Sequence, residues 1–150
     1  MSLANAVFAD CAETSTQSVV DDIQIVHTTR SVVVVEDNPD IRKLICMTLA
    51  PVEAEVVALS DGHQFSQYIE ESAPPSVVVL DRMLPGLSGD LLLEKIRAND
   101  DWKNVPVVMI SALRRKYDVQ QLLKSGANLY LPKPLDFRTL LDVVGQCVDE

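Results

Sequence analysis

The sequence predicts an α/β domain in which a doubly wound parallel sheet carries helices on both faces. Two patterns support this prediction. Short β-branched runs recur from position 31 onward and are apolar on consecutive residues, as expected of parallel strands covered on both sides. Segments with helical apolar spacing separate these runs, and strict alternation gives parallel strands joined by right-handed crossovers. With 150 residues, the chain is long enough to bury the core of such a fold.

Five strands are predicted from these runs. They are SVVVV at 31–35, AEVVA at 54–58, SVVVL at 76–80, PVVMI at 106–110 and NLYL at 128–131. The second run continues into Leu59 and Ser60 and has no charged residue at its end. The other runs are followed by acidic residues, by Ser111 and Ala112, or by Lys133. This difference favours an edge position for the second strand, away from any site at the strand ends.

Five helices are predicted between and after the strands, because apolar residues recur there at helical spacing. The first begins at Pro39, a residue type favoured in the first helical turn, and ends before Pro51. The fourth ends at Gly126, since glycine commonly follows the last helical turn. The second, third and fifth begin near residues that suit a helix start: Asp61, Ser88 and Asp136.

Composition and charge exclude several classes of protein. The net charge of −9 argues against a nucleic-acid surface, because binding a polyanion requires a basic patch. The one basic run, Arg114 to Lys116, is typical of a solvated helix start. No apolar run approaches the roughly 20 residues that span a bilayer, and no basic residue precedes Arg30, so no secretory signal is expected. Widely spaced cysteines favour reduced thiols in a cytoplasmic protein: Cys11, Cys46 and Cys147.

Residues 1–30 differ from the rest of the chain. They are rich in Ala, Ser, Thr, Gln and Asp and show no sustained periodicity. We expect a flexible N-terminal arm or linker there, in which VVDDIQIV at 19–26 could add a short strand or turn. The folded domain is therefore expected to cover residues 31–150.

Polar residues follow four of the five predicted strands. Glu36 and Asp37 follow the first, Asp81 the third, Ser111 the fourth and Lys133 the fifth. The carboxyl ends of parallel strands meet at one edge, where ligand sites gather. Adjacent carboxylates repel by roughly 4 kcal/mol at ~4 Å and an effective dielectric constant of ~20. Three clustered carboxylates therefore predict a hard cation with oxygen ligands, and Mg²⁺ fits a site with few protein ligands.

The order of these motifs resembles the receiver domain of bacterial two-component response regulators. The motifs are ED at 36–37, D-x-x-L-P-G-x-x-G at 81–89, SA at 111–112 and Y-x-x-K-P at 130–134, and the resemblance covers about residues 31–150. It implies a flavodoxin-like (βα)5 sheet with strand order 2-1-3-4-5. It also implies a phosphorylation-dependent signalling switch of the cytoplasm, which is a phosphoacceptor rather than an enzyme.

By this resemblance, Asp81 accepts a phosphoryl group from a histidine kinase or a histidine phosphotransfer protein. Mg²⁺ is the implied cofactor, with Asp37, Asp81 and the main-chain carbonyl of Met83 as ligands. Glu36 would hold metal-bound water. Lys133 would pair with Asp81 at rest and with a phosphoryl oxygen after transfer.

The resemblance also assigns a switch. Ser111 would donate its hydroxyl to the phosphoryl group, and Tyr130 would turn inward as the fourth helix repacks. The Lys133–Pro134 bond is expected to be cis, as in the family. Met83 and Leu113 occupy the two positions that tune phosphate lifetime. Because neither side chain orients water, we expect slow self-dephosphorylation.

The resemblance leaves the partner open. Either a separate protein or a fused output domain would read the switch, and the sequence does not decide whether the chain acts alone or belongs to a longer protein. The face of the fourth helix, fifth strand and fifth helix, with Lys124, Tyr130 and Arg138, would make the switchable contact or a homodimer. We expect no direct contact with nucleic acid or membrane.

Three other functions compete with this interpretation. The first is an interaction module that works without phosphorylation. The second is an aspartate-based phosphatase of the haloacid dehalogenase type, although Met83 stands where that family's D-x-D motif has its second acid. The third is a flavin-binding protein, which the acidic EDNPD segment at 36–40 disfavours because it would repel phosphate.

Overall fold

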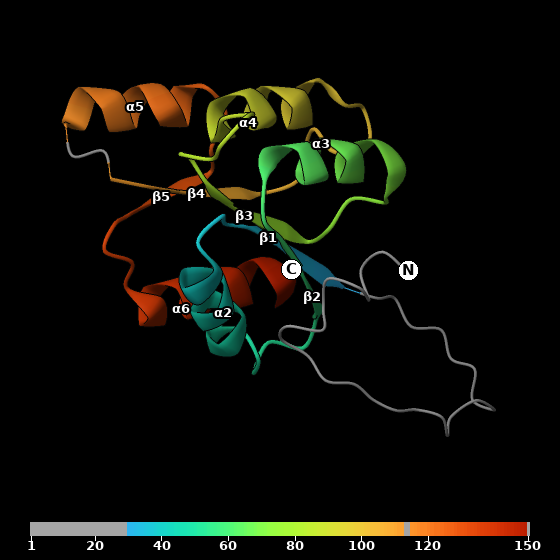
Figure 1. Ribbon diagram of the computed structural model, residues 1–150, viewed down its shortest axis with the longest axis vertical. Helices are drawn as coiled ribbons and strands as arrows, with labels where there is room; N and C mark the ends of the chain where they lie inside the picture. Colours follow the sequence, from blue (N-terminus) through green and yellow to red (C-terminus); the bar gives the residue numbers. More distant parts are fainter. Residues whose placement is uncertain (1–29, 113–114, 150) are drawn as a thin grey trace.

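The computed structural model describes residues 30–112 and 115–149, which form a sheet between two layers of helices (Figure 1). Strands and helices alternate along the chain: β1 (Ser31–Val35), α2 (Pro39–Thr48), β2 (Glu55–Leu59), α3 (Gly62–Glu71), β3 (Val77–Asp81), α4 (Gly89–Ala98), β4 (Val107–Ser111), α5 (Lys116–Lys124), β5 (Leu129–Pro132) and α6 (Phe137–Asp149). The expected arm lies outside the described residues, except for Arg30.

The five strands form one parallel sheet in the order β2-β1-β3-β4-β5. Val33 in β1 lies opposite Val57 in β2 and Val78 in β3, so β1 is paired on both sides. The predicted fold class and strand order are confirmed. β2 occupies an edge of the sheet, as predicted from the residues that follow it.

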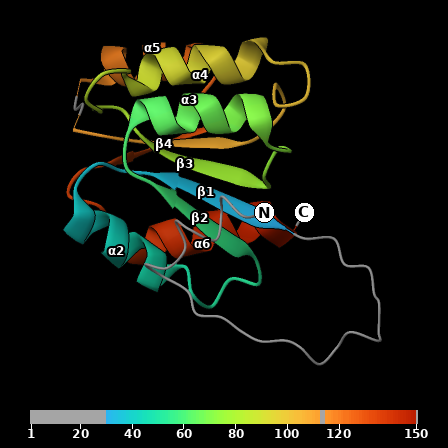
Figure 2. The same ribbon diagram turned by 45° about the vertical axis from the view of Figure 1, so that its right-hand side comes forward.

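The helices cover the sheet in two layers. Helices α3, α4 and α5 lie on one face, and α2 and α6 lie on the other (Figures 1 and 2). Side chains of a strand alternate between the two faces, so Val33 and Val35 pack toward α3–α5 while Val32 and Val34 pack toward α2 and α6. This double burial explains why four consecutive valines form one strand.

Polar side chains begin four of the helices, and Asp61, Ser88 and Asp136 were predicted to do so. Asp136 Oδ1 accepts from the backbone N–H groups of Arg138 and Thr139, at 3.0 and 3.2 Å. Asn38 Oδ1 accepts from the backbone N–H groups of Asp40 and Ile41, at 2.9 and 3.0 Å. Asp61 Oδ1 accepts from Gln64 N at 2.8 Å, and Ser88 Oγ accepts from Leu91 N at 3.3 Å. Each cap satisfies a backbone donor that the first helical turn leaves unpaired, and is worth about 1 kcal/mol.

Several element boundaries differ from the predicted ones. Asp81 and Ser111 are the last residues of β3 and β4, whereas the sequence pattern placed them just after the strands. Both continue the ladder, because Asp81 lies opposite Ile110 and Ser111 lies opposite Pro132. Helix α2, in contrast, ends as predicted: Thr48 is its last residue, and its C-cap Leu49 lies two positions before Pro51.

No helix in the described ranges is both long and apolar enough to span a bilayer. The longest helix, α6, is 13 residues in length. Cys46 is buried in α2 and Cys147 is half-buried in α6, whereas Cys11 lies outside the described ranges.

Candidate functional site

Three carboxylates gather at the carboxyl edge of the sheet. Glu36 and Asp37 follow β1, Asp81 ends β3, and β1 and β3 are neighbours that pair Val35 with Leu80. One carboxylate oxygen from each acid lies within 4.8 Å of the other two. Glu36 and Asp81 are 2 % and 1 % exposed, whereas Asp37 is exposed to solvent. The structure thus brings together the three acids that the sequence analysis singled out.

A lysine from the loop after β5 contacts this cluster at the same edge of the sheet. Lys133 Nζ lies 3.1 Å from Asp81 Oδ2, and the lysine side chain is 37 % exposed while that of Asp81 is 1 % exposed. The lysine stands on the loop between β5 and α6, and the Lys133–Pro134 peptide bond is cis, as expected. Its charge partly compensates the repulsion among the three carboxylates.

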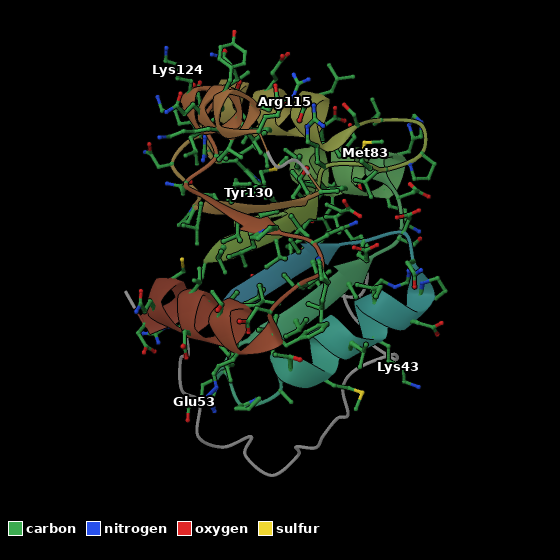
Figure 3. All side chains as sticks on the ribbon, turned by 90° about the vertical axis from the view of Figure 1, so that its left-hand side faces the viewer. Lys43, Glu53, Met83, Arg115, Lys124 and Tyr130 are labelled. Atoms are coloured by element: carbon green, nitrogen blue, oxygen red, sulfur yellow. The ribbon has the colours of Figure 1, made fainter. Side chains whose placement is uncertain are left out.

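Ser111 lies at the end of β4, the strand next to Asp81. Its side chain is 1 % exposed, and its backbone carbonyl accepts two hydrogen bonds. One comes from the Tyr130 hydroxyl at 3.2 Å and the other from the Lys133 N–H at 2.9 Å. Tyr130 lies on β5 (Figure 3) and is half-buried. Its hydrogen bond links it to the segment that holds Ser111.

The loop after β3 wraps closely around Asp81. The backbone N–H of Met83 donates to Asp81 Oδ1 at 3.1 Å, while the Met83 side chain is 67 % exposed. Gly89 begins α4 against the end of β3, where an added Cβ would lie 2.6 Å from the Asp81 carbonyl oxygen. Gly86 adopts a φ of 84°, in the left-handed region that favours glycine. This glycine-dependent turn holds α4 next to Asp81.

Burial perturbs one acid strongly. The pKa of Glu36 is raised from 4.5 to about 7, chiefly because its carboxylate is removed from water and also because Asp81 lies nearby. The backbone N–H of Asn38 donates to Glu36 Oε2 at 3.1 Å and opposes this rise. The second oxygen, Oε1, is buried and has no hydrogen-bond partner among the described residues. A cation or its bound water at the cluster would satisfy that oxygen.

Some predicted positions are not brought to the cluster, and one contributor was missed. Leu113 lies outside the described residues. Lys124 and Arg138, which were predicted for the switchable face and not for the cluster, are exposed on α5 and α6. Arg42 was not predicted, yet its guanidinium donates to the Glu36 carbonyl at 3.0 Å. Its place in the first turns of α2, six residues after Glu36, was the available signal.

Comparison with known proteins identifies the class. Residues 32–145 match the family described as response regulator receiver domain. The chemotaxis protein CheY1 of Helicobacter pylori is 31 % identical over 102 residues, covering 67 % of this chain and 82 % of that protein. The chain belongs to the response regulator receiver domain family, whose members are phosphoacceptor switches of two-component systems.

Relatives of very different length share this domain. The sensor histidine kinase TmoS of Ectopseudomonas mendocina is 33 % identical over 109 residues, which are 73 % of this chain but 11 % of the kinase. The chain spans less than half the length of several such relatives. In structure, it is similar to the receiver domain of the sensor histidine kinase PA1611 from Pseudomonas aeruginosa PAO1, with a TM-score of 0.71, 26 % identity and coverage of 82 % of this chain and 100 % of that one.

Proposed function

We propose that this chain is a phosphorylation-dependent switch in a two-component phosphorelay, and that Asp81 is its phosphoacceptor. The observation that carries the proposal is the setting of Asp81. It is a buried carboxylate at the end of a central strand, 3.1 Å from the Lys133 ammonium and within 4.8 Å of two further carboxylates. The donor would be a histidine kinase or a histidine phosphotransfer protein, since kinases and regulators both carry this domain among its relatives.

The transfer follows ordinary phosphoryl chemistry. A carboxylate oxygen of Asp81 attacks phosphorus, the O–P bond forms, and the P–N bond of phosphohistidine breaks as the imidazole nitrogen leaves with the electron pair. Lys133 holds Asp81 in place before transfer through its 3.1 Å contact and then pairs with a phosphoryl oxygen. The product is an acyl phosphate on a chain that does not turn over a separate substrate, which is why we class it as a phosphoacceptor and not an enzyme.

The donor set fits a magnesium ion. Three carboxylates supply hard oxygen ligands, and the partnerless Glu36 Oε1 is a buried acceptor that needs a positive or hydrogen-bonding neighbour. We propose Asp37, Asp81 and the Met83 carbonyl as ligands, with Glu36 holding metal-bound water. When bound, Mg²⁺ supplies positive charge that neutralises phosphoryl oxygens. The structure of the PA1611 receiver domain, a relative, has a magnesium ion coordinated in its active site cleft.

The output would pass through Ser111 and Tyr130. In the resting geometry, the Tyr130 hydroxyl donates to the Ser111 carbonyl at 3.2 Å, so the two residues share one segment. Phosphorylation adds a charge of about −1.5 to −2 at Asp81. We propose that the Ser111 hydroxyl then donates to the phosphoryl group, which changes this segment and repacks α5. The face of α5, β5 and α6, with Lys124, Tyr130 and Arg138, would present the change to a partner or a second copy.

Two further features belong to the proposal. Met83 extends an exposed side chain with no group that orients water, so we expect slow loss of phosphate. We also place the protein in the cytoplasm, where histidine kinases phosphorylate their regulators. The output partner is either a separate protein or a domain fused to this one, because several relatives are much longer than this chain.

Chemical trapping tests the assignment of the acceptor. The full chain is treated with acetyl phosphate and Mg²⁺ and then reduced with borohydride, which converts an aspartyl phosphate into homoserine. Peptide mass mapping should find homoserine at position 81 and at no other acid. Homoserine at Asp37, or at no position while the protein stays folded, would contradict the proposal.

A further inference from the structure

A groove separates α4 from α5 on the outer surface of the α3–α5 layer. Its volume is about 380 Å³, within the range of pockets that bind ligands. Leu93 and Leu122 lie behind its floor and are 0 % and 5 % exposed, so they leave almost no apolar surface open to a ligand. Glu94 from α4 and Asp118 and Gln121 from α5 line the groove above this floor. We call this feature the α4–α5 groove.

The α4–α5 groove carries excess negative charge. Arg82 and Asp90 also line it, but they form an ion pair at 3.1 Å and cancel one another. Glu94 and Asp118 take part in none of the ion pairs found within residues 30–112 and 115–149. The groove therefore offers two carboxylates from facing helices, Glu94 on α4 and Asp118 on α5.

Exposed apolar side chains flank the groove. Leu91 is 51 % exposed and precedes Glu94 by three residues, so the two lie on one side of α4. Tyr117 is 66 % exposed and precedes Gln121 by four residues on α5. Large apolar groups beside a charged groove are typical of a protein interface rather than of a site for a small free cation.

We propose that the α4–α5 groove binds an arginine or lysine side chain carried by an amphipathic helix of a partner protein. The aliphatic stem would lie along the side chain of Gln121, and the cationic head would lie between Glu94 and Asp118. The apolar side of the helix would cover Leu91 and Tyr117. None of its lining residues belongs to the carboxylate cluster, and it uses the side of α5 that faces α4, so it shares this helix with the α5–β5–α6 face. Its charges are present without phosphorylation.

The test is a titration of the unphosphorylated, ¹⁵N-labelled full chain with a designed peptide, followed by NMR. The probe is an acetylated, amidated helix of alanine, leucine and arginine, and its matched control carries citrulline, which is neutral and almost the same shape, in place of arginine. Glu94→Gln and Asp118→Asn each remove one groove carboxylate. Glu53→Gln is the control, because it removes a carboxylate from the loop between α2 and β2. Figure 3 shows Glu53 far from Arg115 and Lys124, which lie at the two ends of α5.

We expect the peptide to change the amide chemical shifts mainly in α4 and α5. Each groove substitution should raise the Kd of the arginine peptide roughly 3- to 5-fold, as for solvent-exposed ion pairs, and both together should raise it roughly 10-fold. Glu53→Gln should change Kd less than about 1.5-fold, and the citrulline peptide should bind at least about 5-fold more weakly. Equal weakening by Glu53→Gln, equal binding of the citrulline peptide, or shifts on another face would overturn the proposal. So would a doubled mass in light scattering with the same shifts, because a second copy would then fill the groove.

Discussion

The ammonium of Lys133 lies 3.1 Å from the carboxylate of Asp81, although 52 positions separate the two residues in the chain. This contact joins the loop after β5 to the end of β3 and gives the buried carboxylate its cationic partner. Because Glu36 and Asp37 lie beside the same carboxylate, Lys133 is the group that offsets repulsion among three acids.

Replacing Lys133 by methionine should destabilise the metal-free protein. The substitution leaves Asp81 buried among carboxylates without its cation, and we expect a loss of about 1–3 kcal/mol in the free energy of unfolding, since the partly exposed lysine lowers the full penalty. Urea denaturation in the presence of a chelator measures the change. Lys133→Arg keeps the charge and is the control. A methionine variant as stable as the arginine variant would show that the contact does not compensate the acids.

The pKa of Glu36 sets a dependence of stability on pH. Its pKa is raised from 4.5 to about 7 on folding, so between these values the folded state holds a proton that the unfolded state has lost. The contribution of Glu36 to the free energy of unfolding is therefore greatest below pH 4.5, falls as the pH rises to about 7 and stays constant above that value. The total loss is about 3 kcal/mol.

Glu36→Gln isolates this effect. Glutamine stays neutral, so the metal-free variant should lack the decline between pH 4.5 and 7 and should be more stable than the parent chain at pH 8. Urea denaturation at a series of pH values, with a chelator present, compares the two proteins. Parallel pH profiles for parent and variant would show that Glu36 is not the group that titrates.

Two glycine-to-alanine substitutions should have opposite effects. At Gly89, an added Cβ would lie 2.6 Å from the Asp81 carbonyl oxygen and 2.7 Å from Arg82 Cα, so the backbone would have to move. We expect Gly89→Ala to lower the free energy of unfolding by more than about 2 kcal/mol. At Gly145 in α6, an added Cβ would meet nothing within 4 Å, and we expect a gain of about 0.5–1 kcal/mol. Thermal and urea denaturation measure both. A Gly89→Ala variant as stable as Gly145→Ala would contradict the close packing of α4 on β3.

The sheet and the carboxylate cluster could be predicted because local patterns determine them. Consecutive buried valines mark a strand covered on both faces, and parallel strands bring their carboxyl ends to one edge. Polar residues that end such strands must therefore meet, as Asp81 and Glu36 do. The last residue of each strand was harder to predict, since Asp81 and Ser111 remain hydrogen-bonded in the ladder although their side chains are polar.

Contacts made by long side chains across the fold had no local signal. The guanidinium of Arg97 donates to the carbonyl oxygens of Lys103, Val105 and Gly126, so one residue of α4 ties the loop before β4 to the end of α5. Gly126 alone was predicted, as a helix-ending residue. The sequence around Arg97 did not distinguish it from other charged helix residues, because its partners lie up to 31 positions away, the farthest being the Asn128 side chain.

The central claim is that Asp81 accepts a phosphoryl group with the help of Mg²⁺. An intact-mass time course with acetyl phosphate tests it most directly, with Asp81→Asn and chelator-treated samples alongside. We predict a gain of about 80 Da, one phosphoryl group, in the parent chain with Mg²⁺ only, and slow loss of that mass after the reagent is removed. A parent chain that stays folded and gains no mass, or an Asp81→Asn variant that gains the same mass, would contradict the claim.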